Sequence, residues 1–416
     1  MDILRIATAG SVDDGKSTLI GRLLFETQSI TKDKIEALKA ASQRKGLDFV
    51  DLSLLTDGLI AEREQGITID VAHIYFNTPN RKYIIADTPG HFEYTRNMVT
   101  GASNASVSII LIDARNGVGE QTRRHFYISS LLEIKNVIVA VNKMDLVNYD
   151  QAVFEKIKSD FNEAATQARK PGQNISFIPL SSLYGENIVN VSDKMTWYQG
   201  ESLLQLLESI PPISLEKENL PFRFPVQQVI RPKKDEFHDF RGYAGKIASG
   251  SISKGDMVTA LPGNQISKVD KIYKFDTELE SASQNESVVI TLEDDIDISR
   301  GNMLVKVGEQ PEFSKQLTAQ VCWMDTNPMR AGSAYLLQHG INRVKTKVSQ
   351  INSSLEISNF EEITNAEELK LNQIGVVSFR LAGPIFADKF EANPSNGAFI
   401  LIDEFSNNTV GVGFML

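Results

Sequence analysis

The stretch that decides the fold of the first part of this chain is Gly10-Ser-Val-Asp-Asp-Gly-Lys-Ser17. It matches the phosphate-loop pattern G-x-x-x-x-G-K-[ST], and it follows an apolar run at residues 4–9 and precedes a helix-like run at residues 18–25. The glycines allow the backbone to curl so that its N–H groups converge on a phosphate, and the N-terminus of the next helix adds partial positive charge. We therefore expect a strand, a phosphate-binding loop and a helix.

The surrounding region, residues 1–212, alternates short apolar runs with helix-compatible stretches, which is typical of a mostly parallel sheet covered by helices. The expected strands are continuously apolar because helices cover both faces of such a sheet. They are residues 4–9, 82–86, 107–112, 137–141 and 176–179. Residues 32–45 are rich in Lys, Ala and Glu and are expected to be helical. Pro211-Pro212 cannot continue a helix and marks the end of this domain.

The pattern changes after Leu220, where alternating residues and frequent glycines predict short antiparallel strands. We expect one β-barrel domain over residues 220–308 and a second over residues 312–416. Strands expected in the second are residues 317–323, 334–338, 343–351, 375–381 and 398–402. The acidic stretch at residues 361–371 is helix-compatible and is expected to be a connector. The predicted architecture is an α/β phosphate-loop domain followed by two antiparallel β-barrel domains.

Composition narrows the class of protein. The formal net charge of −10 argues against broad binding to nucleic acid or to a membrane surface, so we expect neither partner. No targeting segment and no apolar run long enough to span a bilayer is visible. The single cysteine, Cys322, excludes an internal disulfide framework and is expected to be a buried small hydrophobic residue. A cytoplasmic location is expected.

The phosphate loop predicts binding of a nucleoside triphosphate with Mg²⁺. Lys16 is expected to reach the β- and γ-phosphates, and the Ser17 hydroxyl is expected to coordinate the magnesium ion. The residues expected to bind the phosphates are Gly10, Ser11, Val12, Asp13, Asp14, Gly15, Lys16, Ser17 and Thr18.

A second motif, Asp87-Thr-Pro-Gly-His91, follows the apolar run at residues 82–86. Asp87 at the end of a strand is well placed to hold Mg²⁺ through water, and the Gly90 N–H can bind the γ-phosphate. His91 beside that phosphate is expected to orient the attacking water, since phosphoryl transfer depends mainly on positioning and electrostatic stabilisation. The nucleotide-binding set therefore extends to Asp87, Thr88, Pro89, Gly90 and His91.

The segment Gly66-Ile-Thr-Ile-Asp70 lies between these two motifs. Its Thr68 offers a hydroxyl and a carbonyl oxygen to Mg²⁺ and to the γ-phosphate. The metal ligands expected from the sequence are Ser17, Thr68 and Asp87.

The base is indicated by Asn142-Lys-Met-Asp145, which follows the apolar run at residues 137–141. The Asp145 carboxylate can accept hydrogen bonds from both N1–H and the exocyclic amine of guanine, whereas adenine would leave it unpaired. Ser181-Ser182-Leu183 would support the guanine O6 through backbone N–H groups. The base-binding set is Asn142, Lys143, Met144, Asp145, Ser181, Ser182 and Leu183, and the predicted ligand is GTP.

Several longer stretches closely resemble the large GTPase subunit, subunit 1, of bacterial sulfate adenylyltransferase. In the first domain they are Leu55-Thr-Asp-Gly-Leu-Ile-Ala-Glu-Arg-Glu-Gln-Gly-Ile-Thr-Ile-Asp-Val71, Tyr94-Thr-Arg-Asn-Met98, Thr100-Gly-Ala-Ser103 and Gln121-Thr-Arg-Arg-His125. In the barrels they are Phe224-Pro-Val-Gln-Gln-Val229, Asp239-Phe-Arg-Gly-Tyr-Ala-Gly245, Asp297-Ile-Ser-Arg-Gly301, Asn393-Pro-Ser-Asn-Gly397 and Thr409-Val-Gly-Val-Gly413. The barrel stretches separate this resemblance from a similarity to elongation factors of the Tu and 1-alpha type.

The resemblance implies a heterodimer with a small catalytic subunit, which forms adenosine 5'-phosphosulfate and pyrophosphate from ATP and sulfate. The present chain would hydrolyse GTP to drive that reaction, with Lys16, Thr68 and His91 taking part. Val12 and Ile67 would flank His91 as an apolar gate on the water. The chain ends at Leu416, so the kinase domain fused to some relatives is expected to be absent.

The chain also departs from the family pattern, since Phe92 stands where Glu is usual and residues 233–238 form an insertion. Two other functions stay open at this point. One is an elongation-factor-type translational GTPase that delivers aminoacyl-tRNA, and the other is a GTP-binding scaffold without turnover.

Overall fold

The computed structural model describes residues 2–44, 46, 50–55, 71–90, 95–211, 220–231, 240–357 and 360–416. The backbone divides into two compact units. The first comprises Met1–Pro212 with Glu356–Glu361, and the second Ile213–Leu355 with Glu362–Leu416. Each unit encloses hydrophobic clusters of its own.

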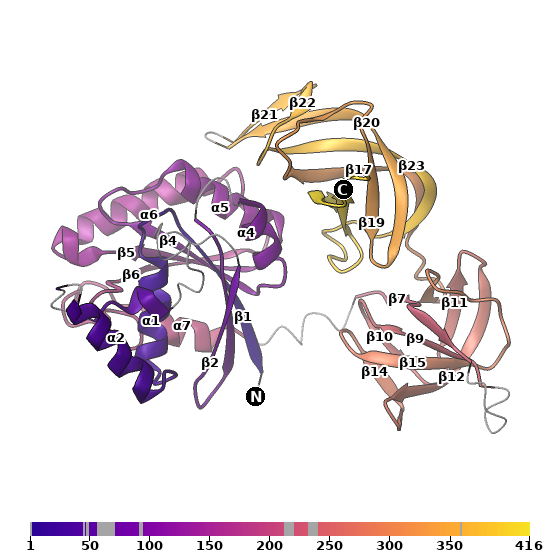
Figure 1. Cartoon of the computed structure of the whole chain (residues 1–416), viewed down its shortest axis with the longest axis horizontal. Helices are drawn as coiled ribbons and strands as arrows, with labels where there is room; N and C mark the ends of the chain where they lie inside the picture. The colour runs from indigo at the N-terminus through magenta and orange to yellow at the C-terminus, as the bar shows by residue number, and fades with distance from the viewer. Residues whose placement is uncertain are drawn as a thin grey trace. The chain divides into compact units, whose positions relative to one another are not determined.

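The first unit is built on a six-stranded sheet in the order β2-β3-β1-β4-β5-β6 (Figure 1). All five strands expected from the sequence are present and pair in parallel. They are β1 (Ile3–Ala9), β3 (Lys82–Asp87), β4 (Val107–Asp113), β5 (Asn136–Asn142) and β6 (Asn174–Pro179). The sixth, β2 (Ala72–Asn77), is an antiparallel edge strand that the sequence did not predict. It is half exposed, so it lacks the continuous apolar run of the others.

Helices cover both faces of this sheet, with α1 and α7 on one face and α5 and α6 on the other (Figure 1). The α-helices are α1 (Lys16–Glu26), α2 (Lys32–Arg44), α4 (Thr95–Ala102), α5 (Glu120–Leu131), α6 (Gln151–Ala165) and α7 (Leu203–Ser209). Two 3₁₀ helices are η1 (Leu52–Leu55) and η3 (Met144–Val147). The Ser202 side chain accepts a hydrogen bond from the Gln205 N–H and so begins α7, and the helix ends just before the prolines. The helix expected at residues 32–45 is α2.

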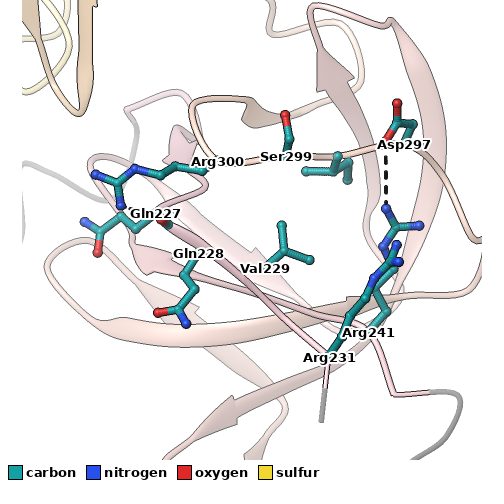
Figure 2. A pocket seen from close by; sticks show the side chains of 9 residues that line it. Gln227, Gln228, Val229, Arg231, Arg241, Asp297, Ser299 and Arg300 are labelled. Carbon is teal, nitrogen blue, oxygen red and sulfur yellow. Dashed lines mark hydrogen bonds and ion pairs between the residues drawn. The ribbon is translucent and has the colours of Figure 1, made fainter. Parts of the chain in front are cut away.

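The second unit begins with a β-barrel formed by an antiparallel sheet in the order β7-β16-β11-β12-β15-β9-β8, with β13 paired to β12. Its strands are β7 (Phe224–Pro225), β8 (Gln228–Ile230), β9 (Gly242–Lys246), β11 (Met257–Leu261), β12 (Gln265–Lys274), β13 (Thr277–Leu279), β15 (Ser287–Leu292) and β16 (Met303–Lys306). A two-stranded ribbon is formed by β10 (Ser251–Ser253) and β14 (Ser281–Ser283). A cavity of about 540 Å³ opens beside β8, the start of β9 and the segment before β16 (Figure 2).

The rest of the second unit is a closed antiparallel barrel, because β19 pairs with both β24 and β20. Its strands are β17 (Glu312–Trp323), β19 (Ala334–His339), β20 (Asn342–Glu356), β23 (Ile374–Ala387), β24 (Ala398–Ile402) and β25 (Thr409–Met415), with β21 (Glu361–Thr364) on β20 and the pair β18 (Met329–Arg330) and β22 (Glu368–Leu369). The five strands expected here are all present. Cys322 is buried in β17, as expected.

The helix-compatible connector expected at residues 361–371 was wrong, since this stretch contains β21 and β22. The side chains of β21 are exposed, and Glu368 of β22 forms an ion pair with Arg330 of the facing strand, 2.7 Å apart. Pairing with neighbouring strands satisfies the backbone here, and that tertiary contact overrides the helix propensity of the acidic residues.

A buried ion pair joins the two barrels of the second unit. Arg223 Nε and Nη2 donate to the two carboxylate oxygens of Asp388 at 2.9 and 2.8 Å. Asn393 Nδ2 donates both to Asp388 and to Ser249 Oγ, each at 2.9 Å. The stretch Asn393-Pro-Ser-Asn-Gly397 that the sequence singled out therefore lies at the junction of the two barrels.

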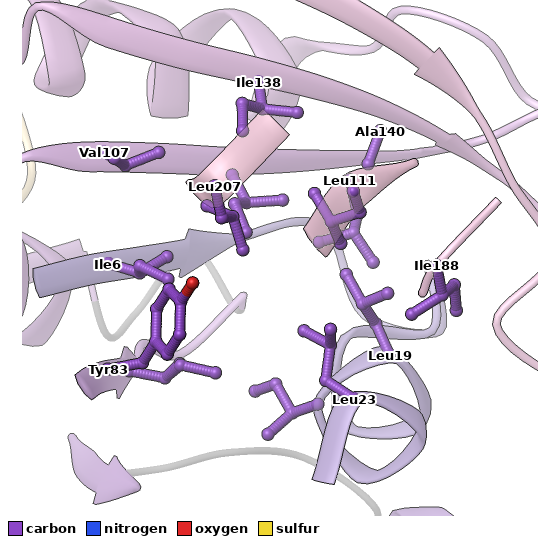
Figure 3. Close-up of a cluster of buried hydrophobic side chains, with 14 of the residues drawn as sticks. Ile6, Leu19, Leu23, Tyr83, Val107, Leu111, Ile138, Ala140, Ile188 and Leu207 are labelled. Carbon is purple, nitrogen blue, oxygen red and sulfur yellow. The ribbon is translucent and has the colours of Figure 1, made fainter. Parts of the chain in front are cut away.

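The main hydrophobic core of the first unit lies between the sheet and the α1–α7 layer (Figure 3). Leu19 and Leu23 of α1 and Leu207 of α7 are buried in it with Ile6 of β1 and Leu111 of β4. Complete burial of such a side chain contributes about 1.5–3 kcal/mol. This core therefore anchors β1 and α1, the two elements between which the phosphate loop lies.

Candidate functional site

The loop between β1 and α1 has the backbone that a phosphate loop requires. Gly15, the residue before α1, has a φ of 91°, and Asp13 has a φ of 68°. A β-carbon at Gly15 would collide with the Asn142 side-chain amide, so glycine is needed there for space as well as for conformation. The Ser11 N–H donates to Asp14 Oδ2 at 2.6 Å, which holds the turn closed.

Asp87, from the second motif, lies directly against the phosphate loop. Lys16 Nζ lies 2.6 Å from Asp87 Oδ1, and both side chains are buried. Thr8 Oγ1 also donates to Asp87 Oδ1 at 3.2 Å, so the carboxylate is held at the end of the adjacent strands β1 and β3. A β-carbon on Gly90 would collide with the carbonyl oxygen of Gly10. The two motifs, far apart in sequence, therefore touch through their backbones.

The Asn142 side chain connects the loop between β1 and α1 to Ser182, which follows β6. Its Nδ2 donates to the carbonyl oxygen of Asp14 at 2.7 Å. Its Oδ1 accepts from the Ser182 N–H at 3.0 Å and from Ser182 Oγ at 2.9 Å. Because Asn142 is buried, these bonds fix three separate loops relative to one another.

Lys143 contacts the phosphate loop and forms an ion pair with Asp113, a residue that the sequence patterns did not identify. Its ammonium donates to the Asp13 carbonyl oxygen and lies 3.0 Å from Asp113 Oδ2. Burial raises the pKa of the Asp113 carboxyl, but hydrogen bonds from Arg115 and Lys143 outweigh burial and bring the pKa to about 2. Asp113 is therefore ionised and positions Lys143. It follows an apolar strand just as Asp87 does, and that signal could have identified it.

The proposed guanine reader lies beside its expected neighbours. Ser181 Oγ donates to Asp145 Oδ1 at 2.5 Å. Arg22 of α1 donates to the carbonyl oxygens of Ser182, at 3.1 Å, and of Leu183. No motif in the sequence pointed to Arg22. Arg22 of α1 therefore occupies the carbonyl groups of Ser182 and Leu183, whereas the Ser181 carbonyl oxygen accepts from the Gly185 and Glu186 N–H groups.

Some of the remaining predicted site residues lie in the described part of the chain, and others lie outside it. Ser17 and Thr18 are in the first turn of α1, and Met144 is a buried residue of η3 whose N–H donates to Leu180 at 3.2 Å. Thr88 and Pro89 continue from β3, and the Val12 side chain is exposed. Ile67, Thr68, His91, Phe92 and residues 233–238 lie outside the described residues.

The described residues fit a magnesium-bound nucleoside triphosphate. The Ser17 hydroxyl and the Asp87 carboxylate offer the oxygen ligands that Mg²⁺ prefers. Such an ion takes its other ligands from phosphate and water, so it requires no cluster of acidic residues. Indeed, within the described ranges no group of three or more His, Cys, Asp or Glu residues could hold a metal.

Comparison with known proteins extends over the whole chain. Residues 1–212 match the family model for the elongation factor Tu GTP-binding domain, and residues 316–416 match the GTP-eEF1A C-terminal domain-like model. Sulfate adenylyltransferase subunit 1 of Psychromonas ingrahamii is 50% identical, over 100% of this chain and 87% of the relative. The protein of that name from Cellvibrio japonicus is 47% identical over 100% of this chain and 87% of its own length.

A bifunctional enzyme CysN/CysC of Mycobacterium tuberculosis is 46% identical over 100% of this chain and 67% of the relative. Among solved structures, sup35 complexed with GDP aligns with a TM-score of 0.44 and 24% identity, over 100% of this chain and 94% of that chain. In the part of the chain that the structure describes, no helix is both long and apolar enough to cross a membrane.

Proposed function

We propose that this chain, which belongs to the sulfate adenylyltransferase subunit 1 family, hydrolyses GTP to drive formation of adenosine 5'-phosphosulfate from ATP and sulfate on a separate small subunit. The observation that carries this proposal is the similarity over the full chain to proteins of that name. The Asn142 contacts support it, because they join the loop expected to bind phosphates to a segment expected to meet guanine. A cytoplasmic complex that assimilates sulfate is the setting proposed.

Lys16 and Ser17 bind the triphosphate in this proposal. The Lys16 ammonium, which faces Asp87, moves its hydrogen bonds to the β- and γ-phosphates, and the loop N–H groups surround the phosphate oxygens. Ser17, Asp87 and Thr68 would hold Mg²⁺, Asp87 through water. The ion, when bound, would supply electrostatic stabilisation of the negative charge on the phosphates.

Hydrolysis then requires a correctly placed water molecule. His91 orients it, with Val12 and Ile67 as apolar neighbours that restrict access. The water oxygen forms a bond to the γ-phosphorus while the bond from that phosphorus to the β-phosphate oxygen breaks. The products are GDP and inorganic phosphate, and a proton is released.

Selection of GTP over ATP rests on Asp145. Its carboxylate accepts from N1–H and from the exocyclic amine of guanine, and residues 181–183 lie against O6. The Leu183 N–H is the donor to O6, because the Ser181 and Ser182 N–H groups already donate to the Glu186 carbonyl oxygen and to Asn142 Oδ1. Asp145 and Ser181 are already adjacent, which supports this assignment. Adenine would not supply the two guanine donors to the Asp145 carboxylate. The binding free energy of ATP would therefore be weaker by about 1–3 kcal/mol.

Coupling to the small subunit requires that it bind the GTP and GDP states with different affinities. Thr68 and the Asp87–His91 segment contact the γ-phosphate in this proposal, so they respond directly to its loss. That response is what the partner would detect.

The proposal is tested with the chain co-purified with the small subunit of sulfate adenylyltransferase. We expect ATP and sulfate to stimulate GTP hydrolysis and GTP to stimulate formation of adenosine 5'-phosphosulfate. His91→Ala should lower both rates about a hundredfold or more with GTP affinity retained, and His73→Ala, at an exposed position of β2, is the matched control.

Stimulation by ribosomes alone would instead identify an elongation-factor-type GTPase. If His91→Ala hydrolysed GTP at the wild-type rate, His91 would lose its assigned role. If the wild-type chain did not hydrolyse GTP at all, the chain would be a GTP-binding scaffold.

A further inference from the structure

The cavity on the first barrel is lined by residues from three of the sequence stretches that distinguish this chain from elongation factors. It is lined by Gln227, Gln228, Val229, Arg231, Arg241, Asp297, Ile298, Ser299 and Arg300. Gln227 to Val229 belong to the first stretch, Arg241 to the second, and Asp297 to Arg300 to the third. The nucleotide site of the first unit accounts for none of these residues, so the cavity requires an explanation of its own.

The cavity is rich in guanidinium groups, although the chain as a whole has a net charge of −10. Among the described residues, neither Arg231 nor Arg300 forms an ion pair with a carboxylate, and Arg300 Nη1 donates to the Gln227 carbonyl oxygen at 2.8 Å. Arg241 pairs with Asp295 and lies 4.0 Å from Asp297, but both aspartate side chains are strongly exposed. The described lining therefore holds three arginines and one aspartate, so its charge is positive and suits an anionic group.

The shape of the cavity indicates what kind of anion it suits. Arg231 and Arg241 lie on one side of Val229, and Arg300 lies on the other with Gln227 (Figure 2). Val229 lies between the two positive sides, and the buried Ile298 also lines the cavity, so the lining has an apolar component (Figure 2). Two separated carboxylates with an apolar side chain between them match this arrangement better than one compact anion does.

We propose that this arginine-lined cavity binds an acidic peptide segment of the small subunit, whose Asp or Glu side chains pair with Arg231 and Arg300. Guanidinium groups present paired N–H donors that match carboxylate geometry, and arginine is enriched in protein interfaces. Arg241 supports the same face by exchanging its exposed aspartate partners for the incoming carboxylate. This inference rests on the proposed function, because the segment belongs to the proposed partner.

The test compares binding of the small subunit to the full-length chain and to the double variant Arg231→Glu/Arg300→Glu. Both arginines are exposed, so the substitutions should leave the thermal unfolding midpoint and basal GTP hydrolysis unchanged. Lys246→Glu, at an exposed position of the same barrel outside the cavity, is the control for reversal of charge.

We expect the dissociation constant, measured by isothermal titration calorimetry, to rise about tenfold or more in the double variant and to change less than about twofold in the control. The wild-type affinity should fall steeply with added salt, and the double variant should lose part of that dependence.

Three outcomes would overturn the inference. If the double variant binds the small subunit as tightly as the wild type, the cavity is not a docking site. If sodium sulfate binds the wild type in an arginine-dependent way while subunit affinity is unaffected, the cavity takes small anions. If the wild-type chain does not bind the small subunit at all, the proposed function itself fails, which is a distinct result.

Discussion

Lys16 Nζ and Asp87 Oδ1 lie 2.6 Å apart, and both side chains are almost completely buried. Lys16 and Asp87 are therefore each other's counter-charges in the first unit. In the proposed function, GTP and Mg²⁺ would give both groups new partners. Removal of either member alone would leave the other as a buried charge without its counter-charge.

We predict that Lys16→Met destabilises the nucleotide-free protein by about 3–5 kcal/mol, because it leaves a buried carboxylate without its cation. The double variant Lys16→Met/Asp87→Asn should recover part of that loss, since it removes both charges. Urea denaturation gives the free energies of unfolding. Lys156→Met breaks an exposed ion pair in α6 and should cost about 1 kcal/mol or less. Equal losses in the buried and exposed variants would contradict the prediction.

We predict that Asn142→Ala weakens GTP and GDP alike. The substitution removes the three hydrogen bonds that hold the phosphate loop and Ser182 together. The loss should be about 1–3 kcal/mol in binding, and fluorescence titration with both nucleotides measures it. Ser182→Ala removes only one of the three bonds and should cost less. A loss confined to GTP would show that Asn142 senses the γ-phosphate rather than the loop arrangement.

We predict that Asp145→Asn changes the preferred base. The substitution exchanges a carboxylate acceptor for an amide donor at the position expected to meet guanine. Affinity for GTP should fall by about a hundredfold or more, and xanthosine triphosphate should become the better ligand. Competition binding with the two nucleotides checks this. An unchanged preference would remove Asp145 from the role of base reader.

We predict that Asp14 makes the free energy of unfolding depend on pH between about pH 4 and pH 6. Burial, followed by the nearby Asp113 charge, raises the pKa of the Asp14 carboxyl from 3.8 to about 6. The folded state therefore binds the proton more tightly than the unfolded state. The corresponding stability is fully present below about pH 4 and is lost as the pH rises through about 6.

The Asp14→Asn variant tests this, because the amide can still accept from the Ser11 N–H but does not titrate in this range. Its free energy of unfolding relative to the wild type should rise by up to about 3 kcal/mol between pH 4 and pH 7. Asp33→Asn, on the exposed face of α2, is the control for loss of a carboxylate. Parallel stability curves for Asp14→Asn and the wild type would contradict the prediction.

Local sequence patterns predicted most of the fold. The five parallel strands were recognisable because each is a short apolar run, and the phosphate loop was recognisable because Gly10, Gly15 and Lys16 have a required spacing. The edge strand β2 and the strand pair β18–β22 were not recognisable from the sequence. A strand at the margin of a sheet is defined by its neighbour rather than by its own composition.

The sequence by itself predicted a phosphate loop, a magnesium-associated carboxylate and a guanine reader in one chain in this order. Only the tertiary structure decided how these segments meet: Asn142 bonds to a residue 128 positions away, Asp113 lies against Lys143, and Arg22 donates to the carbonyl groups of Ser182 and Leu183. The same is true of the arginine cavity, which draws on three separate stretches of the barrel. A motif records residues that are close along the chain, whereas these contacts depend on which strands the topology places side by side.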